Sequence, residues 1–223
     1  MRAAVAIARK DLLVELRTKE SVPAMSLFAI TTFVVFHFGL DRDTLEGELA
    51  AGVLWVTLLF AAILGINRLF VAEREQGGFD GILMAPVERT ALLAGKAAAL
   101  LIYLVALELV AIPVFGLFFI ESGFWQALPK LAAIALLADI GLALVGAMLA
   151  SIAVHTRARD LLLPLLLLPL AVPAVIAAAA ATKPLLSIPP DSAGLGKWLA
   201  VLALYDAVFG LISYALFDFL MED

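Results

Sequence analysis

Three acidic residues lie deep inside long apolar stretches of the sequence and are the first candidates for chemistry. They are Glu108, Asp139 and Asp206. A carboxyl group at such a position is costly to bury, so it is expected to face the interior of a helical bundle or a cavity. The three could form a polar pathway or proton relay, or they could hold helices together through hydrogen bonds. We favour hydrogen bonding, because their spacing follows no shared motif.

The carboxyl groups need partners other than basic side chains, because no lysine or arginine is expected at a similar depth. Each is therefore expected to be protonated or hydrogen-bonded. The hydroxyl groups of Tyr103, Tyr205 and Ser213 and nearby backbone groups are the candidate hydrogen-bonding partners.

The sequence contains none of the common motifs for metal, haem or nucleotide sites. There are no cysteines, which excludes disulfides and thiolate ligands. His37 and His155 are expected near opposite ends of two apolar runs, about 30 Å apart, so one copy cannot use both on one haem. The zinc-protease pattern H-E-x-x-H and the phosphate-binding pattern G-x-x-x-x-G-K-[ST] are both absent. We expect no metal, catalytic residue or cofactor in this chain, and no nucleic-acid surface.

The elements that must position these residues are membrane-spanning helices. Of the 223 residues, 64% are apolar and only 16% are charged, against about 45–50% and about 25% in soluble domains. A spanning helix needs about 20 mainly apolar residues. The sequence predicts six spans in one all-α membrane domain covering residues 1–223: about 22–40, 49–70, 91–120, 127–153, 160–181 and 198–219.

The basic residues predict the orientation of these spans. If the N-terminus is inside, eleven of the fifteen lysines and arginines fall on the inner side and four on the outer side. Because cytoplasmic loops carry the excess of basic residues, both termini are expected in the cytoplasm. The four outer residues are Arg42, Lys130, Lys183 and Lys197.

Residues 1–20 precede the first span and predict an interfacial helix. Val5, Ala8, Leu12 and Leu16 recur at helical spacing among several charged residues. Such a helix could act as an elbow on the inner leaflet that leads into the first span. A plain basic anchor beside the membrane would show the same pattern.

A charged loop, expected at residues 71–90, follows the second span. It contains the stretch FVAEREQGGFDGILMAP at residues 70–86. Two glycines loosen the backbone, and three apolar residues then recur at i, i+3 and i+4, so a short helix with one apolar face is predicted before a proline. This helix could rest on lipid or fit into a partner protein, and its acidic cluster suits an anionic inner leaflet poorly. The residues concerned are Glu73, Arg74, Glu75, Gly77, Gly78, Phe79, Ile82, Leu83 and Pro86.

Four prolines fall inside predicted spans and are expected to bend them. Pro113 lies in the long third span, and Pro164, Pro169 and Pro173 lie within ten residues of one another in the fifth. Each removes a backbone donor, although spanning helices tolerate proline when neighbouring groups compensate. We predict a bent helix at a moving interface.

The second and third spans and their loop resemble the haem exporter protein B family, CcmB. The resemblance lies in GVLWVTLLFAAILGINRLFVAEREQGGFDGILMAPVERTALLAGK, in the block PLLLLPLAVPAVIAA from Pro164, and in the length and six spans. Trp55, Arg68-Leu69-Phe70 and the three prolines are the features that point to CcmB. The loop pattern is shared more widely among type-2 ABC exporter permeases, and the resemblance implies that permease fold.

The resemblance also implies a role for the loop. In such permeases a short cytoplasmic helix after the second span docks into an ATP-binding subunit. Phe79, Ile82 and Leu83 would fill the groove, and Glu73, Arg74 and Glu75 would form its polar rim. The implied partners are a CcmA-like ATP-binding ABC subunit, a CcmC-like haem-handling membrane subunit, a small accessory subunit, a periplasmic haem chaperone and a second copy of this chain.

The implied function is that of a permease subunit in the bacterial inner membrane during cytochrome c maturation, coupling ATP hydrolysis in a partner to haem export or to release of loaded haem chaperone. ATP and haem would be bound by other subunits. Three alternatives stay open: a type-2 ABC permease for a glycan or drug, an intramembrane lipid enzyme using Glu108, Asp139 and Asp206, and a structural scaffold.

Overall fold

The computed structural model describes residues 2–42, 44–70, 89–121, 123–153, 156, 159–192 and 194–220. The described chain is helical throughout, with no strand in these ranges. The elements are α1 (Arg2–Thr18), α2 (Ser21–Gly39), α3 (Gly47–Arg68), α6 (Arg89–Phe119), α7 (Phe124–Ala153), α8 (Arg159–Thr182), the short 3-10 helix η1 (Lys183–Leu186) and α9 (Leu195–Leu220). Within the described residues, six helices are long and apolar enough to cross a membrane. Each end lies within three residues of its prediction, which confirms the six spans.

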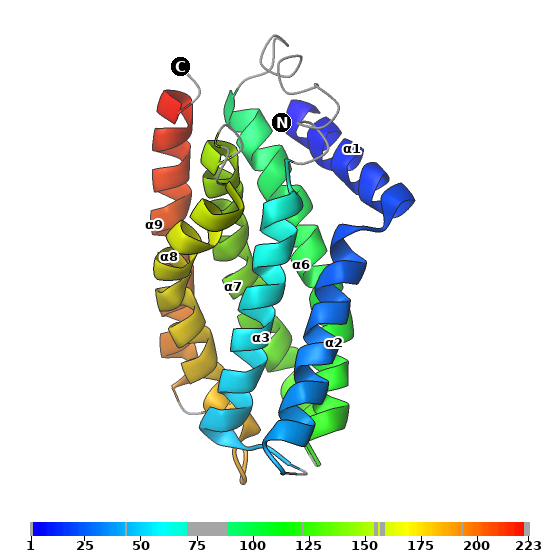
Figure 1. The fold of residues 1–223 in the computed structure, drawn as a ribbon. Helices are drawn as coiled ribbons and strands as arrows, with labels where there is room; N and C mark the ends of the chain where they lie inside the picture. Colours follow the sequence, from blue (N-terminus) through cyan, green and yellow to red (C-terminus); the bar gives the residue numbers. More distant parts are fainter. Residues whose placement is uncertain are drawn as a thin grey trace.

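The six long helices run side by side, and α1 lies at an angle to them at one end of the bundle (Figure 1). That end, called the α1 end below, also holds the C-terminal end of α3, the N-terminal end of α6 and the C-terminal end of α9. The opposite end holds η1 and the start of α9. α1 packs on α6, α2 packs on α3 and α6, and α7 contacts α3, α6, α8 and α9.

Small residues let the central helices approach closely. In a membrane, helices associate through close packing rather than through a hydrophobic driving force, and alanine or glycine at the interface makes this possible. In α8, the buried alanines recur at helical spacing on one face: Ala171, Ala174, Ala177, Ala178 and Ala181. α3 and α8 pack against each other.

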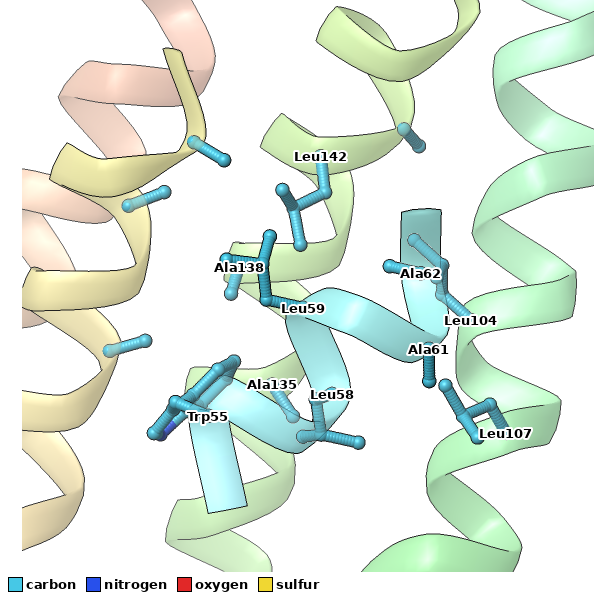
Figure 2. Close-up of a cluster of buried hydrophobic side chains, with 14 of the residues drawn as sticks. Trp55, Leu58, Leu59, Ala61, Ala62, Leu104, Leu107, Ala135, Ala138 and Leu142 are labelled. Carbon is cyan, nitrogen blue, oxygen red and sulfur yellow. The ribbon is translucent and has the colours of Figure 1, made fainter. Parts of the chain in front are cut away.

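Larger side chains fill the space around α3. Trp55, Leu58, Leu59, Ala61 and Ala62 of α3 point toward α6, α7 and α8, as Figure 2 shows. The indole Nε1 of Trp55 donates a hydrogen bond of 2.9 Å to the hydroxyl oxygen of Thr182, and both residues are buried. This bond joins the first half of α3 to the last residue of α8.

The four apolar residues that recur at helical spacing in α1 do not share one environment. Ala8 is buried, and Leu12 packs partly against the core, whereas Val5 and Leu16 are exposed together with Leu13. The physical reason is that α1 has two apolar environments to meet. One face packs on α6, and the outward face carries the apolar side chains that an interfacial helix would place in lipid.

Candidate functional site

The loop predicted to couple the chain to a partner, residues 73–86, lies outside the described residues, as does His155. The structure does describe the chain on both sides of that loop. α3 ends at Arg68 and is followed by Leu69 and Phe70, which are buried, and α6 begins at Arg89. The candidate site is therefore built from the residues that fix these two chain ends.

A tight corner joins α1 to α2 at this end of the bundle. Lys19 has a φ of 52°, the left-handed conformation that commonly ends a helix, and its amide donates to the carbonyl of Glu15. The carboxylate of Glu15 then accepts hydrogen bonds from the amides of Ser21 at 3.0 Å and Val22 at 2.9 Å. These amides have no partner within the first turn of α2, so Glu15 caps that helix from the preceding one.

Arg68 connects this corner to the end of α3. One of its guanidinium nitrogens lies 3.6 Å from the Glu20 carboxylate and 3.4 Å from the Glu20 carbonyl oxygen. Both side chains are largely exposed, so the pair stabilises the contact only weakly. Arg68 still brings the corner between α1 and α2 beside the start of the loop.

A buried lysine lies at the centre of the site. The side chain of Lys96 is only 1% exposed, and its Nζ lies 3.0 Å from the carboxylate of Asp11, which is 8% exposed. The same Nζ donates to the carbonyl oxygen of Leu69 at 2.9 Å and lies 4.7 Å from the centre of the Phe70 ring. One ammonium group carried by α6 thus contacts α1 and the end of α3.

Further contacts surround the ion pair where α1 crosses α6. The hydroxyl of Tyr103 donates to the backbone carbonyl of Asp11 at 3.1 Å, and Lys10 pairs with the Asp11 carboxylate at 3.0 Å. At Gly95, a Cβ atom would lie 2.8 Å from Cβ of Ile7 and 2.9 Å from the carbonyl oxygen of Ala4. Glycine is therefore required where the two helices cross.

Sequence reasoning missed this site. Lys96 stands only as one of eleven basic residues on the inner side and as the last residue of the stretch that resembles CcmB, and Asp11 as one charge among many near the N-terminus. A signal was present, since Lys96 is a single charge in the apolar run ALLAGKAAALL. A lysine in that position needs a buried partner or a route to water, but the sequence does not say which acid supplies it.

Of the three deep acids, the structure brings two into direct contact. The side chains of Glu108 in α6 and Asp139 in α7 lie close enough to interact with each other. A hydrogen bond between the two carboxyl groups needs a proton on one of them. Asp206 of α9 lies instead against Gly141 of α7, where an added Cβ would be 2.6 Å from its Oδ1. Among the described residues, Oδ2 of Asp139 and Oδ1 of Asp206 are buried without a hydrogen-bond partner.

The hydroxyl groups that the sequence offered as possible partners of these acids donate to other groups. Tyr103 donates to Asp11, Tyr205 donates to the carbonyl of Leu170 at 2.9 Å, and Ser213 approaches the sulfur of Met148 at 3.6 Å. The reason is geometric, because each hydroxyl reaches a neighbouring helix before it reaches a carboxyl group. The contact between Glu108 and Asp139 favours the interhelical hydrogen-bonding interpretation over a relay through all three acids.

We expect replacement of Asp139 by leucine to destabilise the contact between α6 and α7 by about 1–3 kcal/mol, because Glu108 loses its hydrogen-bonding partner. Replacement by asparagine, which has nearly the same size and can still hydrogen-bond, should cost less. Thermal unfolding of the purified chain in detergent measures both. Equal losses in the two variants would show that the hydrogen bond contributes little.

The predicted bends fall inside continuous helices. α6 includes Pro113, and α8 includes Pro164, Pro169 and Pro173, and neither helix is interrupted. Bending at these prolines during function stays a prediction.

His37 lies among aromatic rings of α2 and α6. Its ring centre is 5.3 Å from Phe38, 5.4 Å from Phe118 and 5.9 Å from Phe119. Its Nδ1 is buried and has no hydrogen-bond partner in the described part of the chain. No group of three or more potential metal ligands occurs within that part.

These features define an all-α, multi-pass membrane protein with a buried ion pair at one end. Residues 2–216 match the family model described as CcmB protein. The chain is 38% identical over 162 residues to "Heme exporter protein B" of Paracoccus denitrificans, covering 72% of each chain. It is 32% identical over 220 residues to the protein of that name from Bradyrhizobium diazoefficiens, covering 96% of each. The chain belongs to the CcmB family, which confirms the resemblance.

Proposed function

We propose that this chain is the membrane permease subunit of a haem export complex of cytochrome c maturation. The observation that carries this proposal is the family match over residues 2–216, together with relatives that carry the name heme exporter protein B. ATP hydrolysis would occur in a separate ATP-binding subunit. Its energy would drive haem export or the release of loaded haem chaperone.

The coupling element of the proposal is the segment 73–86. The buried contacts at the α1 end support it indirectly, because Lys96 holds the chain that enters this segment against the helix that leaves it. A movement of the segment would then be passed to the helical bundle at the contact between Lys96 and the end of α3. The proposed complex contains two copies of this chain, an ATP-binding subunit for each, a haem-handling membrane subunit, an accessory subunit and a periplasmic haem chaperone.

The proposed location is the bacterial inner membrane, with both termini in the cytoplasm. Six spans return the chain to the side on which it starts, and α1 and the end of α9 lie at the same end of the bundle (Figure 1). The sequence predicts eleven of the fifteen basic residues on that side, as expected for the cytoplasmic face.

Replacement of Phe79 or Leu83 by aspartate is expected to remove the ATP-binding subunit from the purified complex. A charged group in an apolar groove costs about 2 kcal/mol or more at an interface hot spot, which is roughly thirtyfold in affinity. Co-purification from membranes and ATP hydrolysis by the complex are the two measurements. Phe79→Leu and Leu83→Met keep an apolar side chain and serve as matched controls.

Unchanged assembly and unchanged ATP hydrolysis in both aspartate variants would overturn the assignment of residues 73–86. Loss of assembly with normal membrane insertion, and retention in both controls, would support it.

A further inference from the structure

The two chain ends that flank residues 71–88 are tied together by a single side chain. Lys96 lies about two helical turns into α6. Its ammonium group bonds to the carbonyl of Leu69 and lies over the ring of Phe70, the last two described residues before the segment. It therefore acts as a C-terminal cap for α3, where a cation also suits the helix dipole.

The same ammonium group connects these chain ends to α1. Its ion pair with Asp11 is almost fully buried, and the Tyr103 hydroxyl holds the backbone of Asp11 from the next turns of α6. The crossing at Gly95 leaves no room for α1 to move toward α6. Three elements from separate parts of the sequence thus meet at the Lys96 ammonium group. The residues that form this contact are called here the Lys96 junction: Asp11, Leu69, Phe70, Lys96 and Tyr103.

Burial gives this junction a defined geometry. Separating a buried ion pair exposes an uncompensated charge to a weakly polar environment, so the partners stay together once paired. An apolar contact of the same size would allow many slightly different arrangements. The junction therefore fixes the relative position of the helices more than it adds to the net stability of the fold.

We propose that Lys96 is a positioning residue for coupling. It fixes α1, the end of α3 and the start of α6 as one unit, so that movement of residues 71–88 is passed to all three together. This inference rests on the proposed coupling role of residues 73–86. It adds that α1 belongs to the moving unit.

The test uses the double variant Lys96→Met with Asp11→Asn, which removes both charges and leaves no buried unpaired ion. The matched control is Lys183→Met with Glu48→Gln, which removes an ion pair between η1 and α3 at the opposite end of the bundle. Each is introduced into the full complex, and the bound ATP-binding subunit and ATP hydrolysis are measured together.

We expect the double variant to retain the ATP-binding subunit but to lose most of the hydrolysis that depends on the membrane chain. A purely structural role would lower binding and hydrolysis in proportion, and that result would overturn the proposal. So would unchanged values of both. The control should match the wild type.

A second measurement separates this proposal from the coupling assignment. Because the chain has no cysteines, spin labels attached to Val5→Cys of α1 and Ile102→Cys of α6, two exposed positions, report the distance between these helices in the isolated chain. We expect a single narrow distance distribution beside Lys96 and a clearly broader one in the double variant. If the wild-type chain binds no ATP-binding subunit, the coupling assignment fails, and the label distances alone decide whether Lys96 positions α1. An unchanged distribution would overturn that role.

Discussion

Replacing Lys96 alone by methionine is expected to destabilise the chain by about 3 kcal/mol. Loss of one partner from a buried ion pair typically costs about 3–5 kcal/mol, because the other charge is left without compensation. The lower end applies here, since Lys10 still pairs with the Asp11 carboxylate and is itself half-exposed. The Leu69 carbonyl also loses its donor.

The measurement is the fraction of folded chain recovered from membranes, followed by thermal unfolding in detergent. Adding Asp11→Asn to Lys96→Met should recover most of the lost stability, because the buried carboxylate that has lost its buried partner is then gone. If the double variant is no more stable than the single variant, the cost does not arise from the buried charge, and the ion-pair explanation is wrong.

Replacing Trp55 by alanine is the second change with a large expected effect, a loss of about 3–5 kcal/mol. Trp55 is the largest side chain among the fully buried residues, and it lies between α3, α7 and α8 (Figure 2). Its removal leaves a cavity whose lining loses its contacts. It also leaves the buried hydroxyl of Thr182 without its donor.

Trp55→Phe is the matched variant, because it keeps an aromatic ring and removes the indole N–H with only a small part of the side-chain volume. We expect it to cost about 1–2 kcal/mol, from the lost hydrogen bond and a small cavity. Thermal unfolding of the three proteins in detergent separates the two contributions. A cost for phenylalanine as large as that for alanine would assign the effect to the hydrogen bond rather than to packing.

The helices of this chain are predictable because each is a long apolar run bounded by charged, glycine or proline residues. The membrane leaves few alternatives, since an unpaired backbone in lipid is too costly for anything but a helix or a closed barrel. The ends of the six helices therefore agree with the prediction from sequence. Even Pro113 and the three prolines of α8 do not interrupt their helices.

The side-chain partners were less predictable, because they depend on how helices rotate and cross. Glu108 and Asp139 are equally deep on adjacent helices, but depth alone does not show that they meet while Asp206 turns to Gly141. The partners of Lys96 are harder to predict than those of the acids. Its partner Asp11 belongs to a helix that the sequence could only place near the membrane surface, and its carbonyl partner leaves no mark in the sequence at all.

The Lys96 junction also has a consequence for how the chain is made. Asp11 leaves the ribosome 85 residues before Lys96 (96 minus 11). At roughly 5–20 residues per second, this interval lasts about 4 to 17 s. Two spans are inserted during that time, while α1 has neither Gly95 to pack on nor an ammonium group for its carboxylate. The first helix to be synthesised thus finds its place only after two spans have been made, and a nascent chain halted before the third span would leave α1 without its contacts to α6.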